Sequence, residues 1–434
     1  MLEIGSRPDF RFAVARTSQS PFPLAAILSN TVYQMKRTIL LLVFFINLSF
    51  YFGQNSINLN QGTIEQKKYF QTLKYEKYND KLIVNTSING KYYRFLFDTG
   101  AAFSVSKKLF EEIKLTKKGS VSVLDASGRK EELIVTSLPK LQLGEITFLN
   151  TEGFVLPETA SQMFDCFQID GIIGSNMLRN SVVQFDDAQK LITITDNSKN
   201  LNLKKVPFQE IKLTQSQSNP RITLVLQKGN EKLADNVLFD SGADKFYDMS
   251  YEAYKFFNSK KTVIEVINES KGTYVWGIHG FDDIKPQAIV NIPSILVNNY
   301  KFENVKVLTT SGNESRIGSQ LLKFGKATID YATKKFYFEP TSKIENFNEI
   351  SKKPWGISPI ISDNKLVVGI IWDKSLEEKI NLGDEILKVD EINYENLNLC
   401  DLFKSNDKIE TQKSVVKLKD IHTNQIKIVE VKRL

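Results

Sequence analysis

The chain has 434 residues, 41% of them hydrophobic, which is enough for roughly two to four domains with well-buried cores. Its 57 Lys and Arg residues exceed its 50 Asp and Glu residues only slightly, and the two signs are interspersed. Interspersed charge is typical of solvated surfaces, so a nucleic-acid groove is excluded as a leading interpretation.

Cysteine and histidine are too scarce for several common kinds of site. Cys166 and Cys400 lie far apart in the sequence, and we expect two ordinary buried thiols. His279 and His422 are the only histidines. A metal centre or a Ser-His-Asp triad is therefore not expected, and no cofactor is predicted.

An apolar segment near the N-terminus begins at Met35. Lys36 and Arg37 precede a mainly apolar run that ends near Gly53, and this pattern resembles a secretory signal peptide over residues 35–53. Residues 1–34 fit no part of such a signal, so we expect an over-extended start. The alternative is an uncleaved anchor, although the run is shorter than the roughly 20 residues of a membrane span. The sequence thus predicts an exported protein, periplasmic or secreted, or anchored to a membrane if the segment is uncleaved.

Two similar β-hairpins follow, each ending on an aspartate. Residues 81–88, the pair Asn89-Gly90 and residues 91–97 predict a hairpin whose second strand leads to Asp98. Residues 222–227, a turn near Gly229 and residues 232–239 repeat the pattern before Asp240. An ionised carboxylate at the end of an apolar strand either caps a turn or is retained for chemistry.

The repetition extends well beyond these hairpins. Leu-Phe-Asp-(Thr/Ser)-Gly-Ala occurs at both aspartates, and an Ile-Gly pair follows each, 76 positions after Asp98 at Gly174 and 78 positions after Asp240 at Gly318. The downstream residues 179–195 align without a gap on 323–339. This is an internal duplication of about 140 residues, the size of a domain. It predicts two β-rich lobes, residues 79–200 and 201–340, related by a pseudo-two-fold axis.

The composition changes near Lys343, and a third unit is expected at residues 350–434. GDEILKVDEIN, which begins at Gly383, resembles a PDZ domain. The resemblance implies a small α+β fold in which Trp355, Gly356, Ile357 and Ser358 form a carboxylate-binding loop for protein C-termini. The alternative is a PDZ-like unit that only packs against the other domains.

The two lobes together resemble a pepsin-like or retropepsin-like aspartic protease, mainly β, fused in one chain. The resemblance implies that Asp98 and Asp240 meet as a catalytic dyad that shares one proton and activates water to hydrolyse peptide bonds. It assigns supporting roles around the dyad to Thr99, Gly100, Ser241, Gly242, Ile173, Gly174, Ile317 and Gly318. It also implies a flap over the substrate, for which we choose the hairpin turn at Asp125, Ala126, Ser127 and Gly128.

Two further expectations concern the surroundings of this dyad. Arg316 stands where the first lobe has Ile172, and we expect its guanidinium to point to solvent or to an acid such as Glu314, because a buried unpaired guanidinium is costly. The alternative is that it points toward Asp240, favours the ionised form and lowers the apparent pKa values of the dyad. The expected partner is a peptide or protein substrate, and the expected state is a monomer. The alternative function is an inactive two-lobed peptide-binding protein with a PDZ-like recruitment module.

Overall fold

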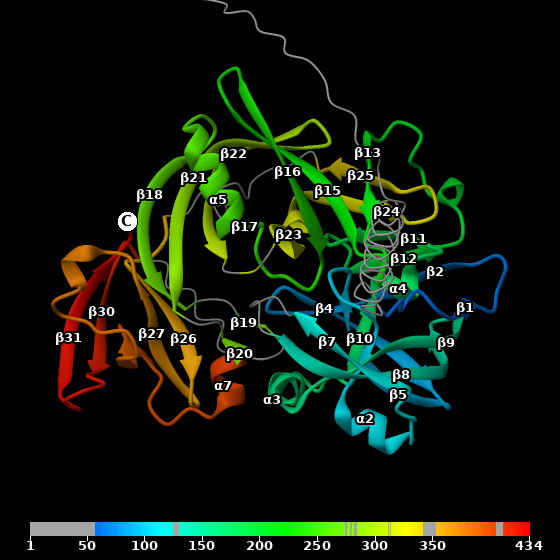
Figure 1. The fold of residues 1–434 in the computed structure, drawn as a ribbon, viewed down its shortest axis with the longest axis horizontal. Coiled ribbons are helices and arrows are strands. Elements are labelled where there is room, and N and C mark those ends of the chain that lie inside the picture. The colour runs from blue at the N-terminus through cyan, green and yellow to red at the C-terminus, as the bar shows by residue number, and fades with distance from the viewer. Residues whose placement is uncertain are drawn as a thin grey trace, which may run out of the picture. The chain divides into compact units, whose positions relative to one another are not determined.

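The computed structural model describes residues 57–124, 130–273, 276–277, 280–281, 284–310, 312, 314–341, 353–404 and 411–434 (Figure 1). Residues 1–34, the signal segment 35–53 and the predicted flap turn 125–128 lie outside this range, so those predictions stand as they were made. In the described part, no helix is both long and apolar enough to cross a membrane.

The first lobe is built on a nine-stranded sheet in the order β1-β9-β6-β10-β5-β4-β8-β7, with β3 paired to β4. Its strands are β1 (Thr63–Ile64), β3 (Glu76–Tyr78), β4 (Lys81–Ile88), β5 (Lys91–Asp98), β6 (Ser104–Val105), β7 (Gly119–Leu124), β8 (Lys130–Leu143), β9 (Ile146–Val155) and β10 (Gly171–Gly174). The helices of this lobe are α2 (Lys107–Glu112), α3 (Glu158–Phe167) and α4 (Ser175–Leu178).

The predicted hairpin before Asp98 is confirmed. Strands β4 and β5 pair in antiparallel register, with Ile88 opposite Lys91. Asn89 and Gly90 between them have positive φ angles of 52° and 79°, which a two-residue hairpin turn requires. The turn therefore fixes the register of β5 and, with it, the position of Asp98 at the end of the strand.

The second lobe and the C-terminal domain share a fourteen-stranded sheet in the order β14-β15-β16-β23-β17-β22-β21-β18-β27-β28-β30-β31, with β26 and β29 as side branches. Its lobe-2 strands are β14 (Lys212–Leu213), β15 (Pro220–Lys228), β16 (Glu231–Asp240), β17 (Tyr247–Ser250), β18 (Glu265–Gly272), β21 (Lys285–Val297), β22 (Tyr300–Thr310) and β23 (Arg316–Gly318). Helix α5 (Tyr251–Lys260), the 3₁₀ helix η2 (Ser319–Phe324) and the small hairpin β19 (Trp276–Gly277) and β20 (Gly280–Phe281) complete this lobe.

The C-terminal domain continues that sheet. Its elements are β26 (Ile357–Ser362), β27 (Lys365–Ile371), the 3₁₀ helix η3 (Lys374–Leu376), β28 (Glu385–Val389), β29 (Ile392–Asn393), α7 (Leu399–Lys404), β30 (Lys413–Lys419) and β31 (Ile426–Lys432). The domain has its own apolar cluster, which includes Val368, Leu418 and Val431. Strand β27 pairs with β18 of the second lobe, where Ile370 lies opposite Gly272. The domain is thus attached to the second lobe by backbone pairing.

A six-stranded sheet joins the two lobes in the order β13-β25-β24-β11-β12-β2. Its strands are β2 (Phe70–Lys74), β11 (Val182–Asp186), β12 (Leu191–Thr195), β13 (Phe208–Glu210), β24 (Gly325–Asp330) and β25 (Lys335–Pro340), and the 3₁₀ helix η1 (Ser198–Asn200) follows β12. The central pair is β11 from one repeat and β24 from the other, with Val183 opposite Ile329. The duplication is therefore visible as two equivalent halves of one sheet. Residues 70–74, which lie before the predicted start of the first lobe, supply an edge strand.

A row of aromatic rings connects the lobes beneath the two aspartates. Phe97 contacts Phe185 with ring centroids 5.6 Å apart, Phe185 contacts Phe239 at 6.0 Å, and Phe239 contacts Phe336 at 5.2 Å. All four side chains are fully buried. Burying each ring stabilises the fold by about 1.5–3 kcal/mol, so the residues directly before Asp98 and Asp240 are held in a rigid base. The mainly β architecture with barrel-like sheets agrees with the sequence prediction.

Candidate active site

Asp98 and Asp240 occupy equivalent positions in the two repeats. Asp98 is the last residue of β5 and lies beside Gly174 of the parallel strand β10. Asp240 is the last residue of β16 and lies beside Gly318 of the parallel strand β23. Each carboxylate is therefore delivered by a central strand that a second, parallel strand supports. The sequence spacing between each aspartate and its glycine reflects this pairing.

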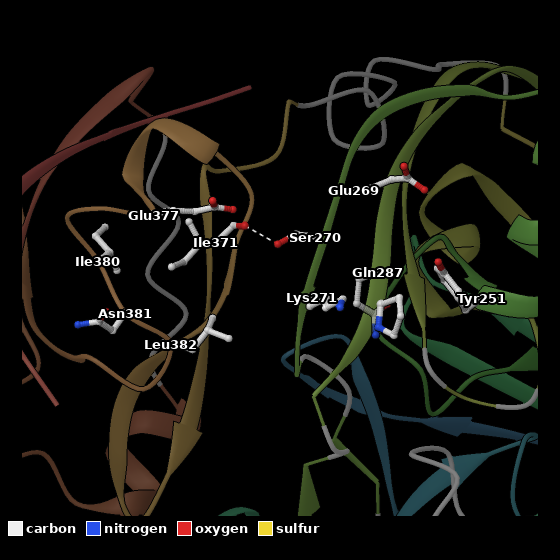
Figure 2. A pocket seen from close by; sticks show the side chains of 11 residues that line it. Tyr251, Glu269, Ser270, Lys271, Gln287, Ile371, Glu377, Ile380, Asn381 and Leu382 are labelled. Atoms are coloured by element: carbon white, nitrogen blue, oxygen red, sulfur yellow. Dashed lines mark hydrogen bonds between the residues drawn. The ribbon is translucent and has the colours of Figure 1, made fainter. Parts of the chain in front are cut away.

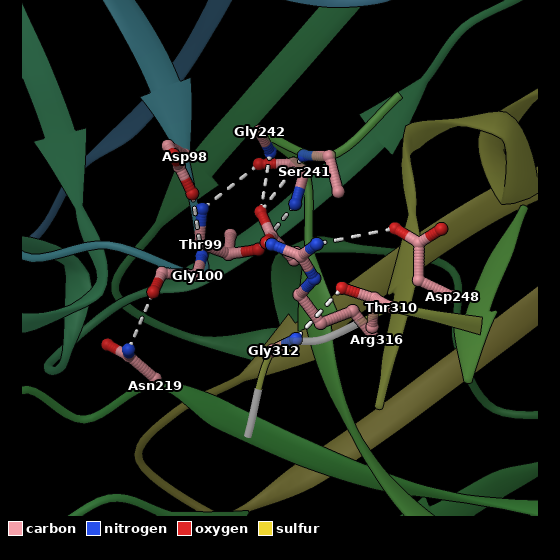
Figure 3. Close-up of polar contacts among 12 residues, drawn as sticks. Asp98, Thr99, Gly100, Asn219, Ser241, Gly242, Asp248, Thr310, Gly312 and Arg316 are labelled. Carbon is pink, nitrogen blue, oxygen red and sulfur yellow. Dashed lines mark hydrogen bonds and ion pairs between the residues drawn. The ribbon is translucent and has the colours of Figure 1, made fainter. Parts of the chain in front are cut away.

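Thr99 and Ser241 bind the two loops to each other (Figure 3). The Thr99 hydroxyl donates to the carbonyl of Phe239 at 2.7 Å, and the Ser241 hydroxyl donates to the carbonyl of Phe97 at 2.9 Å. In return, the Ser241 N–H donates to Thr99 Oγ1 and the Thr99 N–H to Ser241 Oγ, both at 3.0 Å. Both side chains are fully buried. Four reciprocal hydrogen bonds in a dry environment thus fix one loop relative to the other.

The glycines after these hydroxyl residues allow the carboxylates to come close. A Cβ atom on Gly100 would lie 2.4 Å from Asp240 Cγ, and one on Gly242 would lie 2.2 Å from Asp98 Oδ2. The N–H of Gly100 donates to Asp98 Oδ1 at 2.8 Å, and the N–H of Gly242 donates to Asp240 Oδ1 at 2.9 Å. Only glycine fits between the loops, and each glycine also orients the carboxylate of its own lobe.

The two carboxyl groups interact directly. Burial raises the pKa of Asp98 well above the usual aspartate range, and the negative charge of Asp240 and a hydrogen bond to it raise that pKa further. The N–H of Gly100 and the charge of Lys81 oppose this shift. Two carboxylates in contact cannot both ionise at low cost, so the pair holds one proton.

This proton makes the stability of the fold depend on pH. Because the folded pKa of Asp98 lies above the unfolded value, its stabilising contribution is present below about pH 4 and is lost as the pH rises through the folded pKa. We expect Asp98→Asn to change the free energy of unfolding more favourably at pH 8 than at pH 4. The difference should be on the order of 1–3 kcal/mol. Denaturant unfolding of both proteins at the two pH values measures this. A difference that is independent of pH would contradict the shared proton.

The predicted supports lie directly under the loops. Ile173 and Ile317 are fully buried in the main apolar cluster, which also contains Phe97 and Phe239. A Cβ atom on Gly174 would lie 2.2 Å from Ala102 C, and one on Gly318 would lie 2.4 Å from the Lys245 carbonyl oxygen. These glycines are needed because the loop that follows each Asp-(Thr/Ser)-Gly triplet passes immediately over them.

Lys81 and Asn219 form a second pair of contacts between the lobes that sequence reasoning missed. The Lys81 ammonium donates to the carbonyl of Gly242, and the Asn219 side-chain amide donates to the carbonyl of Gly100 at 2.7 Å. Lys81 opens β4, and Asn219 directly precedes β15, the equivalent strand. Alignment of the two hairpins places Lys81 and Asn219 at the same position of the repeat. This equivalence is the sequence signal that could have revealed the pair.

The expectation for Arg316 is wrong. Its Nη1 lies 3.7 Å from Asp240 Oδ2, and its Nη2 lies 3.4 Å from Asp248 Oδ2. Glu314, the alternative partner, forms an ion pair with Arg221 instead. Arg316 avoids the cost of a buried unpaired charge because Asp248, on the neighbouring strand, faces it. The replacement of Ile172 by Arg316 in the repeat marks this position, but it does not show which way the arginine side chain points.

The expectation of two free thiols is also wrong. Cys166 in α3 and Cys400 in α7 form a disulfide across a sequence separation of 234. Phe167 and Phe403, each in one of the two helices, contact each other with ring centroids 6.5 Å apart. The bond joins the first lobe to the C-terminal domain, and a spacing argument could not detect it because the two domains meet only in the folded chain.

The predicted carboxylate-binding loop makes contacts within the C-terminal domain. The N–H of Gly356 donates to the Lys432 carbonyl at 2.9 Å, and Trp355 forms an isolated bridge with Arg433. Ile357 begins β26, and the Ser358 hydroxyl accepts a hydrogen bond of 2.8 Å from the indole of Trp372. The four residues lie together at the start of β26, and their role in peptide binding stays a prediction.

A separate cavity of about 690 Å³ lies between the second lobe and the C-terminal domain (Figure 2). Glu269 and Gln287 line it from strands β18 and β21, while Ile371 and Leu382 line it from the C-terminal domain. Neither catalytic candidate lines this cavity, so it is distinct from the dyad. Among the described residues, no cluster of His, Cys, Asp and Glu has the arrangement of a metal site.

The two Asp-(Thr/Ser)-Gly loops are interlocked at the ends of equivalent strands, which is the arrangement that the resemblance to aspartic proteases predicts. In agreement, residues 84–180 match the family model described as gag-polyprotein putative aspartyl protease. This segment contains Asp98 and Gly174, whereas the assignment of the second lobe rests on its geometry.

Among solved structures, the chain is similar to the crystal structure of basic 7S globulin from soybean, with 10% identity and a TM-score of 0.39. That match covers 63% of this chain and 96% of the globulin chain. No curated protein matches the chain.

Proposed function

We propose that the protein is an aspartic endopeptidase in which Asp98 and Asp240 activate water. The observation that carries the proposal is the interlocked pair of loops, in which each carboxylate rests against the glycine of the opposite lobe. The family match over residues 84–180 supports it for the first lobe.

The chemistry follows from one proton shared by two carboxyl groups. The ionised carboxylate takes a proton from the attacking water, and the protonated carboxyl donates a hydrogen bond to the scissile carbonyl. As water attacks, the protonated carboxyl gives its proton to the carbonyl oxygen, which yields a tetrahedral diol. The carboxyl that took the proton from water then protonates the amide nitrogen, the C–N bond breaks, and a diol hydroxyl returns its proton to the other carboxylate. No acyl-enzyme forms, and no cofactor takes part in these steps.

The surrounding features support an exported protease with an accessory domain. A disulfide persists in an oxidising compartment, which agrees with the signal peptide expected at residues 35–53. An uncleaved segment would instead anchor the protein to a membrane. We propose that the C-terminal domain presents a PDZ-like site for substrate or partner C-termini, and that the enzyme acts as a monomer on peptides or proteins.

A peptide library tests the activity. We expect the purified full chain to cleave it, with new termini detected by mass spectrometry, and we expect reagents that modify catalytic serines or cysteines to have no effect. Peptides that are retained by the protein but never cleaved between pH 3 and pH 8 would favour the alternative, an inactive peptide-binding protein.

A further inference from the structure

Arg316 is a charged residue that breaks the symmetry of the dyad, as is Lys81, whose place in the second lobe is taken by Asn219. It lies in β23 between β16, which ends at Asp240, and β17, where Asp248 is its register partner. At the equivalent place in the first lobe, Ile172 pairs with Ser104. Ile172 belongs to an apolar cluster with Leu96 and Ile169. One carboxylate therefore has a guanidinium next to its strand, and the other has an isoleucine.

The guanidinium of Arg316 lies near both Asp240 and Asp248, and Figure 3 shows it beside Asp248. The side chain of Arg316 is only 15% exposed, and its Nη1 lies 3.7 Å from Asp240 Oδ2. Burial raises the pKa of Asp248, the other partner, while Arg316 opposes that shift. The guanidinium therefore lies between two carboxyl groups, and its positive charge acts on Asp240 as well as on Asp248.

Backbone donors add to the same asymmetry. Asp240 Oδ1 accepts hydrogen bonds from the N–H groups of Gly242 and Ala243, at 2.9 and 3.0 Å. Asp98 Oδ1 accepts a single such bond, from Gly100. Hydrogen bonds to the charged form favour ionisation. Lys81 in β4 opposes this asymmetry, because its charge lowers the pKa of Asp98. Asp244 and Lys245, in the loop after β16, act on Asp248.

We propose that Arg316 is a positioning residue that keeps Asp240 ionised, so that the shared proton resides on Asp98 and Asp240 is the base that deprotonates water. This inference rests on the proposed function. It assigns distinct roles to two residues that the repeat makes formally equivalent. Arg316 also leaves Asp240 Oδ2 able to accept a hydrogen bond from water, because the guanidinium is beyond hydrogen-bonding distance of that oxygen.

The pH–rate profile of Arg316→Met tests the proposal. A nearby cation lowers the apparent pKa values of a carboxyl pair by about 1 unit or more, so its removal should move both limbs of the kcat/KM profile upward by about 1 unit. Arg316→Lys keeps the charge and should shift the limbs by less than half of that. Arg221→Met, which removes a cation paired with Glu314, should leave the profile in place.

A second measurement covers variants with low turnover. A peptide with a hydroxymethylene group in place of the scissile carbonyl should bind the singly protonated dyad, and calorimetry should show the same upward shift in the pH range of tight binding. If Arg316→Met does not fold, the double variant Arg316→Met/Asp248→Asn, which removes both charges, takes its place. Its pH range of tight binding is expected to shift in the same direction.

The outcomes separate this inference from the proposed function. If cleavage requires both Asp98 and Asp240 but the profile of Arg316→Met coincides with that of the wild type, the inference is overturned and the proposed function stands. If cleavage survives the loss of either aspartate, the proposed function itself fails. An upward shift in Arg316→Met with an unchanged profile in Arg221→Met supports the role of Arg316 in setting the protonation of the dyad.

Discussion

Asp240→Asn is expected to reduce peptide cleavage by at least about 10³-fold while the protein stays folded. The asparagine carbonyl can still accept from the N–H groups of Gly242 and Ala243, which hold the loop. It cannot take a proton from water, so general base catalysis is lost. Initial rates on a peptide identified from the library, measured from pH 3 to pH 8, give the size of the loss.

The control for this variant is Asp165→Asn, which removes an exposed aspartate on helix α3. It should keep the wild-type rate. Cooperative unfolding of Asp240→Asn, monitored by circular dichroism, would show that the loss of activity is chemical. Substantial turnover by the folded Asp240→Asn protein at any of these pH values would refute the dyad.

Cys400→Ser is expected to have the largest effect on stability. The disulfide closes a loop with a sequence separation of 234, and the chain-entropy relation gives a stabilisation of about 5.5 kcal/mol as an upper bound. We therefore expect a clearly lower unfolding midpoint in guanidinium chloride for Cys400→Ser than for the oxidised wild type. Cys166→Ser should behave in the same way, because it removes the same bond.

Reduction provides the matched comparison. A reductant should lower the unfolding midpoint of the wild type toward that of Cys400→Ser and should leave the variant unchanged. Alkylation followed by mass spectrometry counts the free thiols in each sample. If the native, unreduced protein carried two alkylated cysteines, the disulfide and the stability difference would both be ruled out.

The sequence was most informative where the duplication repeats a motif. The Asp98 and Asp240 triplets, their hairpins and the downstream glycines could be predicted because equivalent positions converge on a pseudo-two-fold axis. The strand of residues 70–74 was less predictable, because its polar and aromatic pattern gives no sign that it completes the edge of a sheet shared by both lobes. Its partner strand, β12, lies more than 100 residues away.

Two contacts could not be predicted from the sequence, for a different physical reason. The cost of burying Arg316 depends on what lies opposite it, and Asp248 becomes its partner only through the register of β17 and β23. Cys166 and Cys400 lie in different domains, so no local pattern links them. In both cases the decisive term is an interaction between segments distant in sequence, which hydrophobic periodicity does not encode.

The C-terminal domain contacts both lobes, and this has a mechanical consequence. Strand β27 is paired with β18 of the second lobe, and the Ser270 hydroxyl donates to the Ile371 carbonyl at 2.6 Å. Helix α7 is held to the first lobe by the disulfide and by a hydrogen bond of 2.6 Å from the Asn79 amide to the Phe403 carbonyl. The three bodies therefore form a closed linkage. If one lobe rotates away from the other, the C-terminal domain must move with it. Otherwise either the β18–β27 pairing or the contacts of α7 with the first lobe must break.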